Sequence, residues 1–419
     1  MLTMRQKKAI SKELRDRYQR ASKKEKGIML NEFIRLTGYN RSYAARALRI
    51  KRVLGYLNIA GKRIKYVADR KTKREKKRFY NKEVFMVLKK IWIICDYICS
   101  KRLAPFLSEV IPVLEKYGEI NLTTGVREKL FKISAATIDR LLADTRKKYR
   151  IKGRSTTRPG SLLKKSIPIR TFADWDEKVP GFFEVDLVSH DGGAVRGDFL
   201  QSLNFTDIAT GWVEMIAVKN KAQVWVFAGI KSIKERLPFS ILGIDSDNGA
   251  EFINAHLLRY CREEHITFTR SRPYRKNDSC FVEQKNWSVI RRAVGYGRYD
   301  TEKELNILNE LYSYLRLYSN LFQPVRKLIK KERIGSKVIK RYDEAKTPYR
   351  RVLASPGIED KIKVKLKNQY DMLNPAELKR KITKLQNRLL KLNALKQKAR
   401  EDLLEKSVEP SSSFVYISA

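Results

Sequence analysis

A stretch of proline, glycine, serine and basic residues at 151–177 divides the chain into two parts. This composition predicts an extended linker, because proline and glycine interrupt regular structure and the charges favour water. Before the linker, apolar residues recur at helical spacing, whereas after it short apolar runs typical of strands alternate with helical patterns. We therefore expect a multidomain protein with an all-α N-terminal part and an α/β domain after the linker.

The first 60 residues are expected to form short helices. An amphipathic run ends at Thr37 to Tyr39, where Gly38 interrupts it, and a basic helix is predicted from Asn40 to Arg49. This is the helix-turn-helix pattern, whose second helix can lie in a DNA major groove. The alternative is an ordinary helical hairpin with a solvated basic face. The candidate DNA-contacting residues of the second helix are Arg41, Ser42, Arg46 and Arg49.

The charge of the chain indicates its partner. It contains 90 Lys+Arg against 46 Asp+Glu, a formal net charge of +44, while 42% of its residues are hydrophobic. A folding chain with this surplus is expected to bind a polyanion, because each neutralised phosphate releases a counterion. No apolar window is long enough for a membrane span, and the N-terminus lacks a secretory signal. Four scattered cysteines fit a reducing, cytoplasmic compartment, and three histidines make a zinc domain unexpected.

The rest of the chain is divided by changes in composition. The long helix near the C-terminus has apolar residues at 4-3 spacing from Leu378 to Leu403, so we expect it to pair with a helix of its own chain or of a second copy. In 81–150, a helix pair with Ser134 as an N-cap is either a second helix-turn-helix or a plain pair. The predicted regions are a helix-turn-helix domain (1–60), a basic linker (61–80), a helical domain (81–150), a Pro/Gly/basic linker (151–177), an α/β core (178–320), a small basic C-terminal domain (321–373), an amphipathic helix (374–406) and a tail (407–419).

Within 178–320, three predicted strands precede a helix, and strand and helix then alternate. This is the order of a ribonuclease-H-like core. Asp186 lies mid-strand, where a charge is costly unless something binds it, and Asp247 opens a turn directly after an apolar strand. Glu283 follows Asp247 after 35 intervening residues and lies just inside a predicted helix. Carboxylates at two neighbouring strand ends and on one helix can converge on a pair of Mg²⁺ ions, which support in-line phosphoryl transfer.

Neighbouring residues have two interpretations each. Glu184 and Asp245 share strand faces with Asp186 and Asp247, and we favour solvated charges over secondary ligands. His190 is expected to be an ordinary loop histidine. Trp287 is expected in the core rather than on a base-stacking surface.

The sequence blocks at 184–186, 246–252, 276–278 and 282–283 resemble those of the D,D(35)E transposase and retroviral-integrase superfamily, and more closely its bacterial insertion-sequence transposases. The resemblance implies that Asp186, Asp247 and Glu283 are catalytic metal ligands for Mg²⁺, with Mn²⁺ as a substitute. Integrases carry an N-terminal His/Cys zinc domain and a DNA-contacting Lys seven residues after the Glu; this chain lacks the former and has Ile290 at the latter position. The candidate DNA-contacting residues near these blocks are Lys276, Asn277, Lys285, Arg291 and Arg292.

The resulting hypothesis is a bacterial, DNA-associated transposase. The resemblance implies that it binds the inverted repeats at its element's ends, cuts them in a metal-dependent reaction and joins the freed 3′-OH to target DNA, as a homo-oligomer on double-stranded DNA. One alternative is a catalytically silent DNA-binding regulator descended from a transposase. The other is a ribonuclease-H-like nuclease without strand transfer, which needs no sequence-reading domain.

Overall fold

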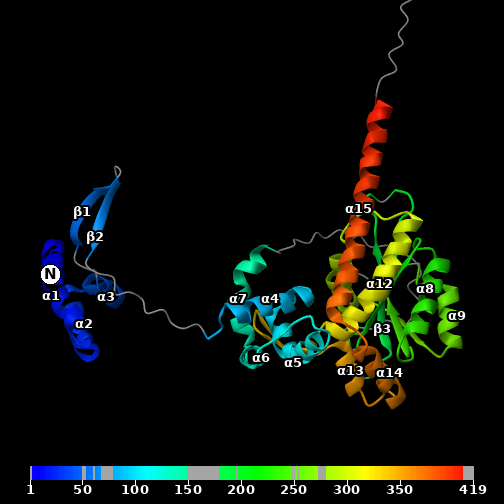
Figure 1. Cartoon of the computed structure of the whole chain (residues 1–419), viewed down its shortest axis with the longest axis horizontal. Helices are drawn as coiled ribbons and strands as arrows, with labels where there is room; N and C mark the ends of the chain where they lie inside the picture. The colour runs from blue at the N-terminus through cyan, green and yellow to red at the C-terminus, as the bar shows by residue number, and fades with distance from the viewer. Residues whose placement is uncertain are drawn as a thin grey trace, which may run out of the picture. The chain divides into compact units, whose positions relative to one another are not determined.

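The computed structural model of the chain describes residues 2–49, 53–59, 62–67, 79–148, 179–194, 196–247, 249, 251–252, 254–271 and 280–408. The contacts divide it into two units, Met1–Phe79 and Tyr80–Ala419, each described by itself (Figure 1). None of the helices in these ranges is both long enough and apolar enough to cross a lipid bilayer.

Three helices form the first unit around a hydrophobic cluster of its own. The helix α2 ends at Gly38, whose backbone is left-handed with φ +64°, so the predicted break is confirmed. The predicted basic helix is α3. The helices are α1 (Met4–Arg20), α2 (Lys23–Thr37) and α3 (Arg41–Arg49). Their cluster contains Tyr18, Leu30, Phe33, Ala44, Ala47 and Leu48.

The first unit is not all-α, contrary to the prediction for 1–60, and part of the predicted linker 61–80 is a strand. The strands β1 (Val53–Ile59) and β2 (Lys62–Val67) pair in an antiparallel hairpin. The β1 sequence is mostly apolar and contains no basic residue, whereas β2 intersperses basic residues with Ile64, Tyr66 and Val67, types that favour strands. The basic residues of β2 obscured its strand pattern.

Four helices open the second unit and share its main core. Their buried side chains, such as Trp92 and Leu107, belong to the same hydrophobic cluster as those of the sheet. Ser134 caps the fourth helix as predicted, because its Oγ accepts a hydrogen bond from Thr137 N at 3.2 Å. The four are α4 (Lys82–Ile94), α5 (Ser100–Lys116), α6 (Thr124–Phe131) and α7 (Ala135–Lys148).

A mixed five-stranded sheet lies at the centre of the second unit, with strand order β5-β4-β3-β6-β7. The first three strands in this order are antiparallel, whereas β3, β6 and β7 are parallel. The element order is the one predicted for 178–320. The strands are β3 (Phe182–Ser189), β4 (Gln201–Asp207), β5 (Val213–Val218), β6 (Gly243–Ser246) and β7 (Thr267–Arg270). The helices around them are α8 (Gln223–Arg236), α9 (Ala255–Glu263), α10 (Cys280–Lys285), the π-helical turn η2 (Asn286–Arg291), α11 (Arg292–Val294) and α12 (Glu302–Phe322).

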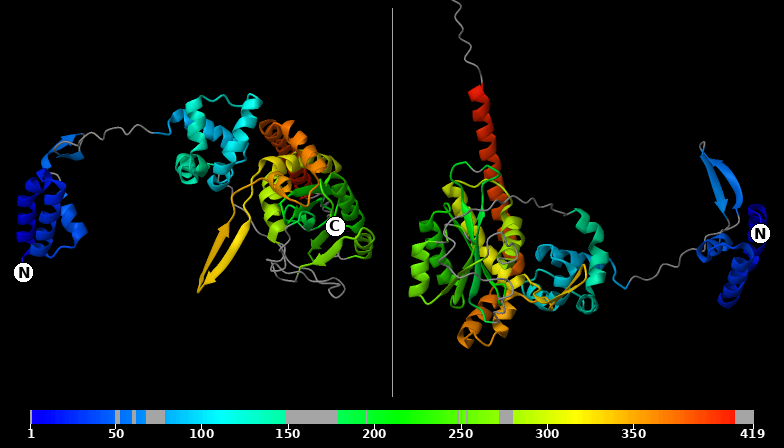
Figure 2. Two further views of the ribbon diagram at one scale, coloured as in Figure 1. Left: turned by 90° about the horizontal axis from the view of Figure 1, so that it is seen from below. Right: turned by 180° about the vertical axis from the view of Figure 1, so that it is seen from behind.

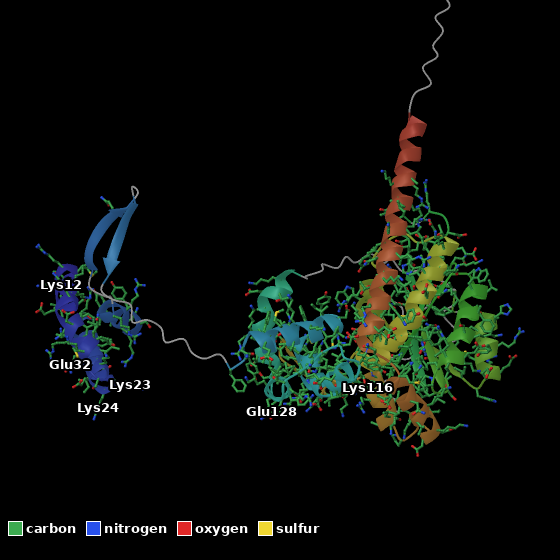
Figure 3. The ribbon with its side chains drawn as sticks, in the orientation of Figure 1. Lys12, Lys23, Lys24, Glu32, Lys116 and Glu128 are labelled. Carbon is green, nitrogen blue, oxygen red and sulfur yellow. The ribbon has the colours of Figure 1, made fainter. Side chains whose placement is uncertain are left out.

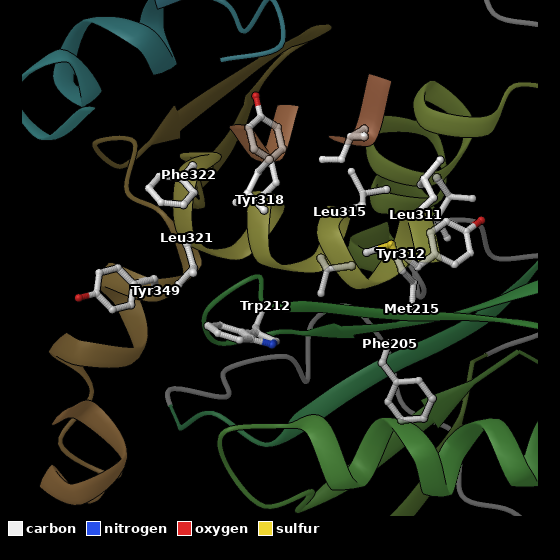
Figure 4. Packing of buried hydrophobic residues seen from close by; sticks show 14 of the residues in the cluster. Phe205, Trp212, Met215, Leu311, Tyr312, Leu315, Tyr318, Leu321, Phe322 and Tyr349 are labelled. Atoms are coloured by element: carbon white, nitrogen blue, oxygen red, sulfur yellow. The ribbon is translucent and has the colours of Figure 1, made fainter. Parts of the chain in front are cut away.

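The helices α8 and α12 cover opposite faces of this sheet. Figure 4 shows Phe205 directed toward one side and Met215 toward α12. Two asparagines of α12 also bond the backbone of the edge strand: Ala217 N donates to Asn309 Oδ1 and Val213 N to Asn320 Oδ1, each at 2.8 Å. This strand edge is therefore closed by its own chain.

The C-terminal region packs onto the second unit. Tyr349 and Tyr370 belong to the main hydrophobic cluster, so 321–373 shares its core with the sheet. Leu378, Ile382 and Leu389 are buried, and the helix that carries them packs on α12 (Figure 2). We expected the apolar face of this helix to pack either on its own chain or on a second copy, and in the structure it packs on its own chain. The elements are β8 (Leu328–Ile334), β9 (Lys337–Tyr342), α13 (Pro348–Ala354), α14 (Asp360–Asp371) and α15 (Pro375–Val408).

Candidate active site

The register between β3 and β6 brings two of the predicted carboxylates together. Glu184 pairs with Asp245 across these parallel strands. Because side chains alternate along a strand, the residues two positions further on, Asp186 and Asp247, share the same face of the sheet. Asp247 follows the last residue of β6, and its Oδ1 accepts a hydrogen bond from Gly249 N at 2.9 Å. The two carboxylates therefore lie next to each other where β6 ends.

Glu283 approaches this pair from α10, which packs against β3 and β4. Its side chain is exposed, whereas Val282 beside it is fully buried. The short helix thus fixes its backbone on the sheet through Val282 and presents Glu283 on its open side. We call Asp186, Asp247 and Glu283 together the acidic edge.

The charges of the acidic edge influence one another. Burial first, then the neighbouring Asp247 charge and to a smaller degree the Glu283 charge, together raise the pKa of Asp186 to about 7. Two hydrogen bonds oppose this shift, from Leu187 N at 2.8 Å and from Asn286 Nδ2 at 2.6 Å. The pKa of Asp247 is raised as well, mainly by burial. Without a counter-charge, full ionisation of this edge is unfavourable.

Asn286 is a site residue that the sequence analysis missed. Its side chain lies between two residues that face each other across the sheet, because Asp186 on β3 pairs with Asn204 on β4. Asn204 Nδ2 donates to Asn286 Oδ1 at 2.7 Å, and Asn286 Nδ2 donates to Asp186 Oδ2 at 2.6 Å. Asn286 is the first residue of the π-helical turn η2, and such turns often occur at functional sites. Its position three residues after Glu283 was the available signal.

Glu184 and Asp245 are not solvated charges, contrary to our prediction. Their side chains are 0% and 2% exposed, because α10 covers this part of the sheet face. Glu184 Oε2 accepts a hydrogen bond from Val282 N at 2.7 Å, and Asp245 Oδ1 accepts one from Thr269 Oγ1 at 2.6 Å. Burial raises the pKa of Glu184 well above its usual value. Glu184 therefore fixes the start of α10 and does not line the open edge.

The donors of the acidic edge match a divalent cation in chemical type. Carboxylate oxygens are the hard ligands that Mg²⁺ and Mn²⁺ prefer, and a cation would offset the mutual repulsion that raises the pKa of Asp186. Across the described ranges, no three His, Cys, Asp or Glu side chains are grouped closely enough to ligate one ion. The residues thus fit a metal by their chemical type and their charge coupling.

The predicted DNA-contacting residues fall into three groups. Arg41, Ser42, Arg46 and Arg49 are all exposed on α3, as predicted for its outer side. In the same unit, Figure 3 shows Lys12, Lys23 and Lys24 projecting from α1 and α2. Lys276 and Asn277 lie outside the described residues.

The remaining three are partly or fully enclosed in the second unit. Lys285 is 7% exposed, and burial, followed by the positive charges of Arg102 and Arg351, lowers its pKa to about 7. Arg291 donates to Ser189 O at 2.7 Å, and Arg292 pairs with Asp96 at 2.9 Å.

The predictions for Trp287 and His190 were both wrong. Trp287 is 51% exposed and is not in the core, because it lies four residues after the exposed Glu283 on the same helical face. His190 is fully buried at the end of β3, with Nε2 2.7 Å from Ser202 Oγ, so it is not an ordinary loop residue. Its pKa is lowered to about 3, first by burial. Trp287 is therefore available at the surface beside the acidic edge.

Comparison with known proteins places the chain in a family. No protein-family model matches it. It is 39% identical over 336 residues to the uncharacterized protein y4rM of Sinorhizobium fredii (strain NBRC 101917 / NGR234), a match that spans 80% of this chain and 92% of that protein. The chain belongs to the y4rM family. The alignment runs through most of both proteins.

Solved structures with local likeness to this y4rM-family chain include retroviral integrases. The catalytic core domain of HTLV-2 integrase in complex with magnesium has a TM-score of 0.26 and 16% identity, covering 35% of this chain and 91% of that one. The core domain of BIV integrase has a TM-score of 0.29 and 19% identity over 42% and 95% of the two chains. A simian T-cell lymphotropic virus intasome has a TM-score of 0.30 and 15% identity over 51% and 70%. At these TM-scores the likeness assigns neither fold nor activity to this chain.

Proposed function

We propose that this protein is a DNA transposase of the Asp/Asp/Glu type. The observation that carries the proposal is the β3–β6 register, which sets Asp186 beside Asp247 where β6 ends, with Glu283 approaching from α10. The strand order β5-β4-β3-β6-β7 also supports it, because this is the arrangement of a ribonuclease-H-like core. The chemistry proposed is phosphodiester cleavage followed by strand transfer.

In this proposal the three carboxylates hold Mg²⁺, or Mn²⁺ in its place. A pair of such cations, when bound, activates the attacking oxygen and stabilises the leaving one in an in-line displacement. Asn286 and Leu187 N hold the Asp186 carboxylate in one orientation. Glu184 anchors the start of α10 through Val282 N and so keeps Glu283 in position over the strands.

The first unit supplies the proposed recognition of DNA. Its exposed α3 residues and the surrounding lysines suit a helix that enters the major groove at the element's ends, while the formal charge of +44 favours phosphate contacts elsewhere. Assembly of two ends requires more than one copy on DNA, so we propose a homo-oligomer in that complex. Its place in the bacterial cell would be on DNA in the cytoplasm.

A cleavage and strand-transfer assay tests this function. Labelled duplexes from the DNA that flanks the coding region are incubated with the full chain and Mg²⁺ or Mn²⁺, with Asp247→Asn as the matched control. The proposal predicts metal-dependent release of a 3′-OH end and its joining to target DNA, both absent in the variant. Cleavage without joining would instead indicate a nuclease.

One observation favours a catalytically silent DNA-binding regulator as the second candidate. Within the described residues, the carboxylates of the acidic edge do not form a group that can ligate a metal as they stand. Tight, end-specific binding with no cleavage under either metal would support the regulator. Loss of both binding and cleavage in Asp247→Asn would mean that the substitution disturbs the fold.

A further inference from the structure

A basic pocket lies beside α10, on the side of this helix that carries Lys285 and not Glu283. It has a volume of about 490 Å³ and is lined by the turn after α4 and by parts of α5, α10, α11, α12 and α15. Five of its lining residues are basic and one is acidic, so its formal charge is strongly positive. The basic ones are Arg102, Lys285, Arg292, Arg326 and Lys379, and the acidic one is Asp96.

Lys285 is the most enclosed of these cations. Its side chain is 7% exposed, and among the described residues it has neither a hydrogen-bond nor an ion-pair partner. The charges that act on it come from Arg102 and Arg351, both positive. A buried charge with two like neighbours is costly unless an anion completes the arrangement.

The nearby carboxylates do not supply that anion. Asp96 is occupied by Arg292 at 2.9 Å and by Lys379 at 2.7 Å. Asp343 is paired with Arg351 at 2.7 Å. The positive charge at Lys285 and Arg102 is therefore left without an acidic partner in the described structure.

The other walls of the pocket suit a nucleotide. Arg326 lies over the Tyr342 ring with its guanidinium carbon 5.1 Å from the centroid, and this leaves donors of its planar group available. Val289, Leu315 and Ile382 add apolar surface. A volume of this size holds a sugar and a base as well as a phosphate, and it is within the range of ligand pockets.

We propose that this pocket binds a phosphate group of a nucleic-acid strand, with Lys285 and Arg102 as its charge partners and Arg326 as a third donor. The inference rests on the proposed function for its choice of DNA as the source of the phosphate. Because Lys285 follows Glu283 by two residues on α10, the phosphate would be held on one side of the helix and the Glu283 carboxylate of the acidic edge would lie on another. Free orthophosphate has the same chemistry and is the second possible source.

The first test measures phosphate binding without DNA. The midpoint of thermal unfolding is recorded for the full chain in EDTA, with sodium phosphate titrated against chloride at constant ionic strength. We expect phosphate to raise the midpoint of the wild type and to have little effect on Lys285→Met or Arg326→Gln. The matched control is Lys367→Met, an exposed α14 residue that removes the same charge. Lys285→Met should also raise the phosphate-free midpoint, because it removes an uncompensated buried charge.

The second test measures binding of a 5′-phosphorylated flanking duplex in EDTA. If a strand phosphate enters the pocket, Lys285→Met and Arg326→Gln should each weaken binding about tenfold, while Lys367→Met changes it little. A lost phosphate shift with unchanged duplex binding identifies free phosphate as the ligand and overturns the strand assignment. Equal phosphate shifts in all four proteins, together with equal duplex binding, overturn the pocket itself.

These outcomes are separate from those of the proposed function. Both tests run without a divalent metal and read binding, so a failure to cleave DNA does not affect them. If the wild type binds no duplex but keeps its Lys285-dependent phosphate shift, the transposase proposal fails and only the phosphate site remains.

Discussion

The acidic edge and the basic pocket lie on opposite sides of one short helix and have opposite charge. Glu283 and Lys285 are two residues apart on α10, yet the first is exposed beside two carboxylates and the second is buried beside two arginines. In each region the like charges repel one another as long as no ligand is bound. Each would be relieved by a different partner, a divalent cation at the edge and a phosphate in the pocket. Phosphoryl transfer on DNA requires both a metal ion and a bound DNA phosphate. In this protein α10 lies between the residues proposed to hold the one and those proposed to hold the other.

The largest effect is expected from a substitution that disrupts the acidic edge and leaves the basic pocket unchanged. Asp247→Asn should reduce cleavage by more than about 100-fold, while duplex binding stays within a few fold. Loss of a residue that only supports a metal ligand already costs up to about 100-fold in activity, and loss of a ligand itself should cost more. A gel-based cleavage assay with a parallel binding titration measures both. Equal loss of binding and cleavage would mean, as above, that the substitution disturbs the fold and does not act on the edge alone.

The next effect concerns the free energy of unfolding at different pH values. The pKa of Asp186 is raised to about 7 in the folded state, so its contribution to stability is present below its unfolded pKa and is lost as the pH rises through 7. In Asp186→Asn the side chain does not ionise, so the free energy of unfolding does not fall in this way as the pH rises. In EDTA the variant should be more stable than the wild type at pH 8 by about 2–4 kcal/mol, and the gap should close toward pH 4.

Urea unfolding at four pH values tests this prediction. Asn204→Asp provides an opposite case, because it adds a carboxylate across the strand from Asp186. It should lower stability at pH 8 more than at pH 5. A pH-independent gap for Asp186→Asn would contradict the raised pKa.

A smaller effect is expected from a substitution on α3, which lies in neither the acidic edge nor the basic pocket and tests sequence recognition alone. Arg46 is exposed on α3, and Arg46→Ala should weaken binding to the element's end by about 1–3 kcal/mol and binding to unrelated duplex by less. Fluorescence anisotropy with the two duplexes measures the difference. An equal loss for both duplexes would assign Arg46 to phosphate contact and leave specificity elsewhere.

The smallest effect tests how Asp186 is oriented. Asn286→Leu removes the hydrogen bond that stabilises the Asp186 carboxylate, so the pKa of Asp186 should rise further and the acid limb of the cleavage profile should move to higher pH. The expected loss at neutral pH is about tenfold or less, the value of one hydrogen bond to a charged group. Asn286→Asp is unsuitable as a conservative variant because it adds charge; Asn286→Gln should restore part of the activity. An unshifted profile would assign Asn286 to packing alone.

The sequence was sufficient to predict the features that depend on local pattern. The strand around Asp186, the strand that ends just before Asp247 and the break at Gly38 follow from periodicity and residue type, and the structure has each of them. The hairpin at 53–67 was not predicted, because the basic residues of its second strand, β2, give that segment the composition of a charged linker.

Features that depend on tertiary placement were not predictable. Asn286 matters because the β3–β4 register puts Asn204 and Asp186 within reach of it, and no spacing along the chain reveals that register. The basic pocket draws Arg102 and Lys379 from segments nearly 280 residues apart. Glu184 was misjudged as solvated since the position of α10 on the sheet was unknown.

The most direct test of the central claim is a calorimetric titration of Mn²⁺ at pH 8, without and with a flanking duplex. The account predicts that the wild type binds Mn²⁺, that Asp186→Asn and Asp247→Asn lose this binding, and that Lys285→Met keeps it. Binding that survives both aspartate substitutions, or no binding by the wild type even with DNA, would contradict the assignment of the acidic edge as the metal site.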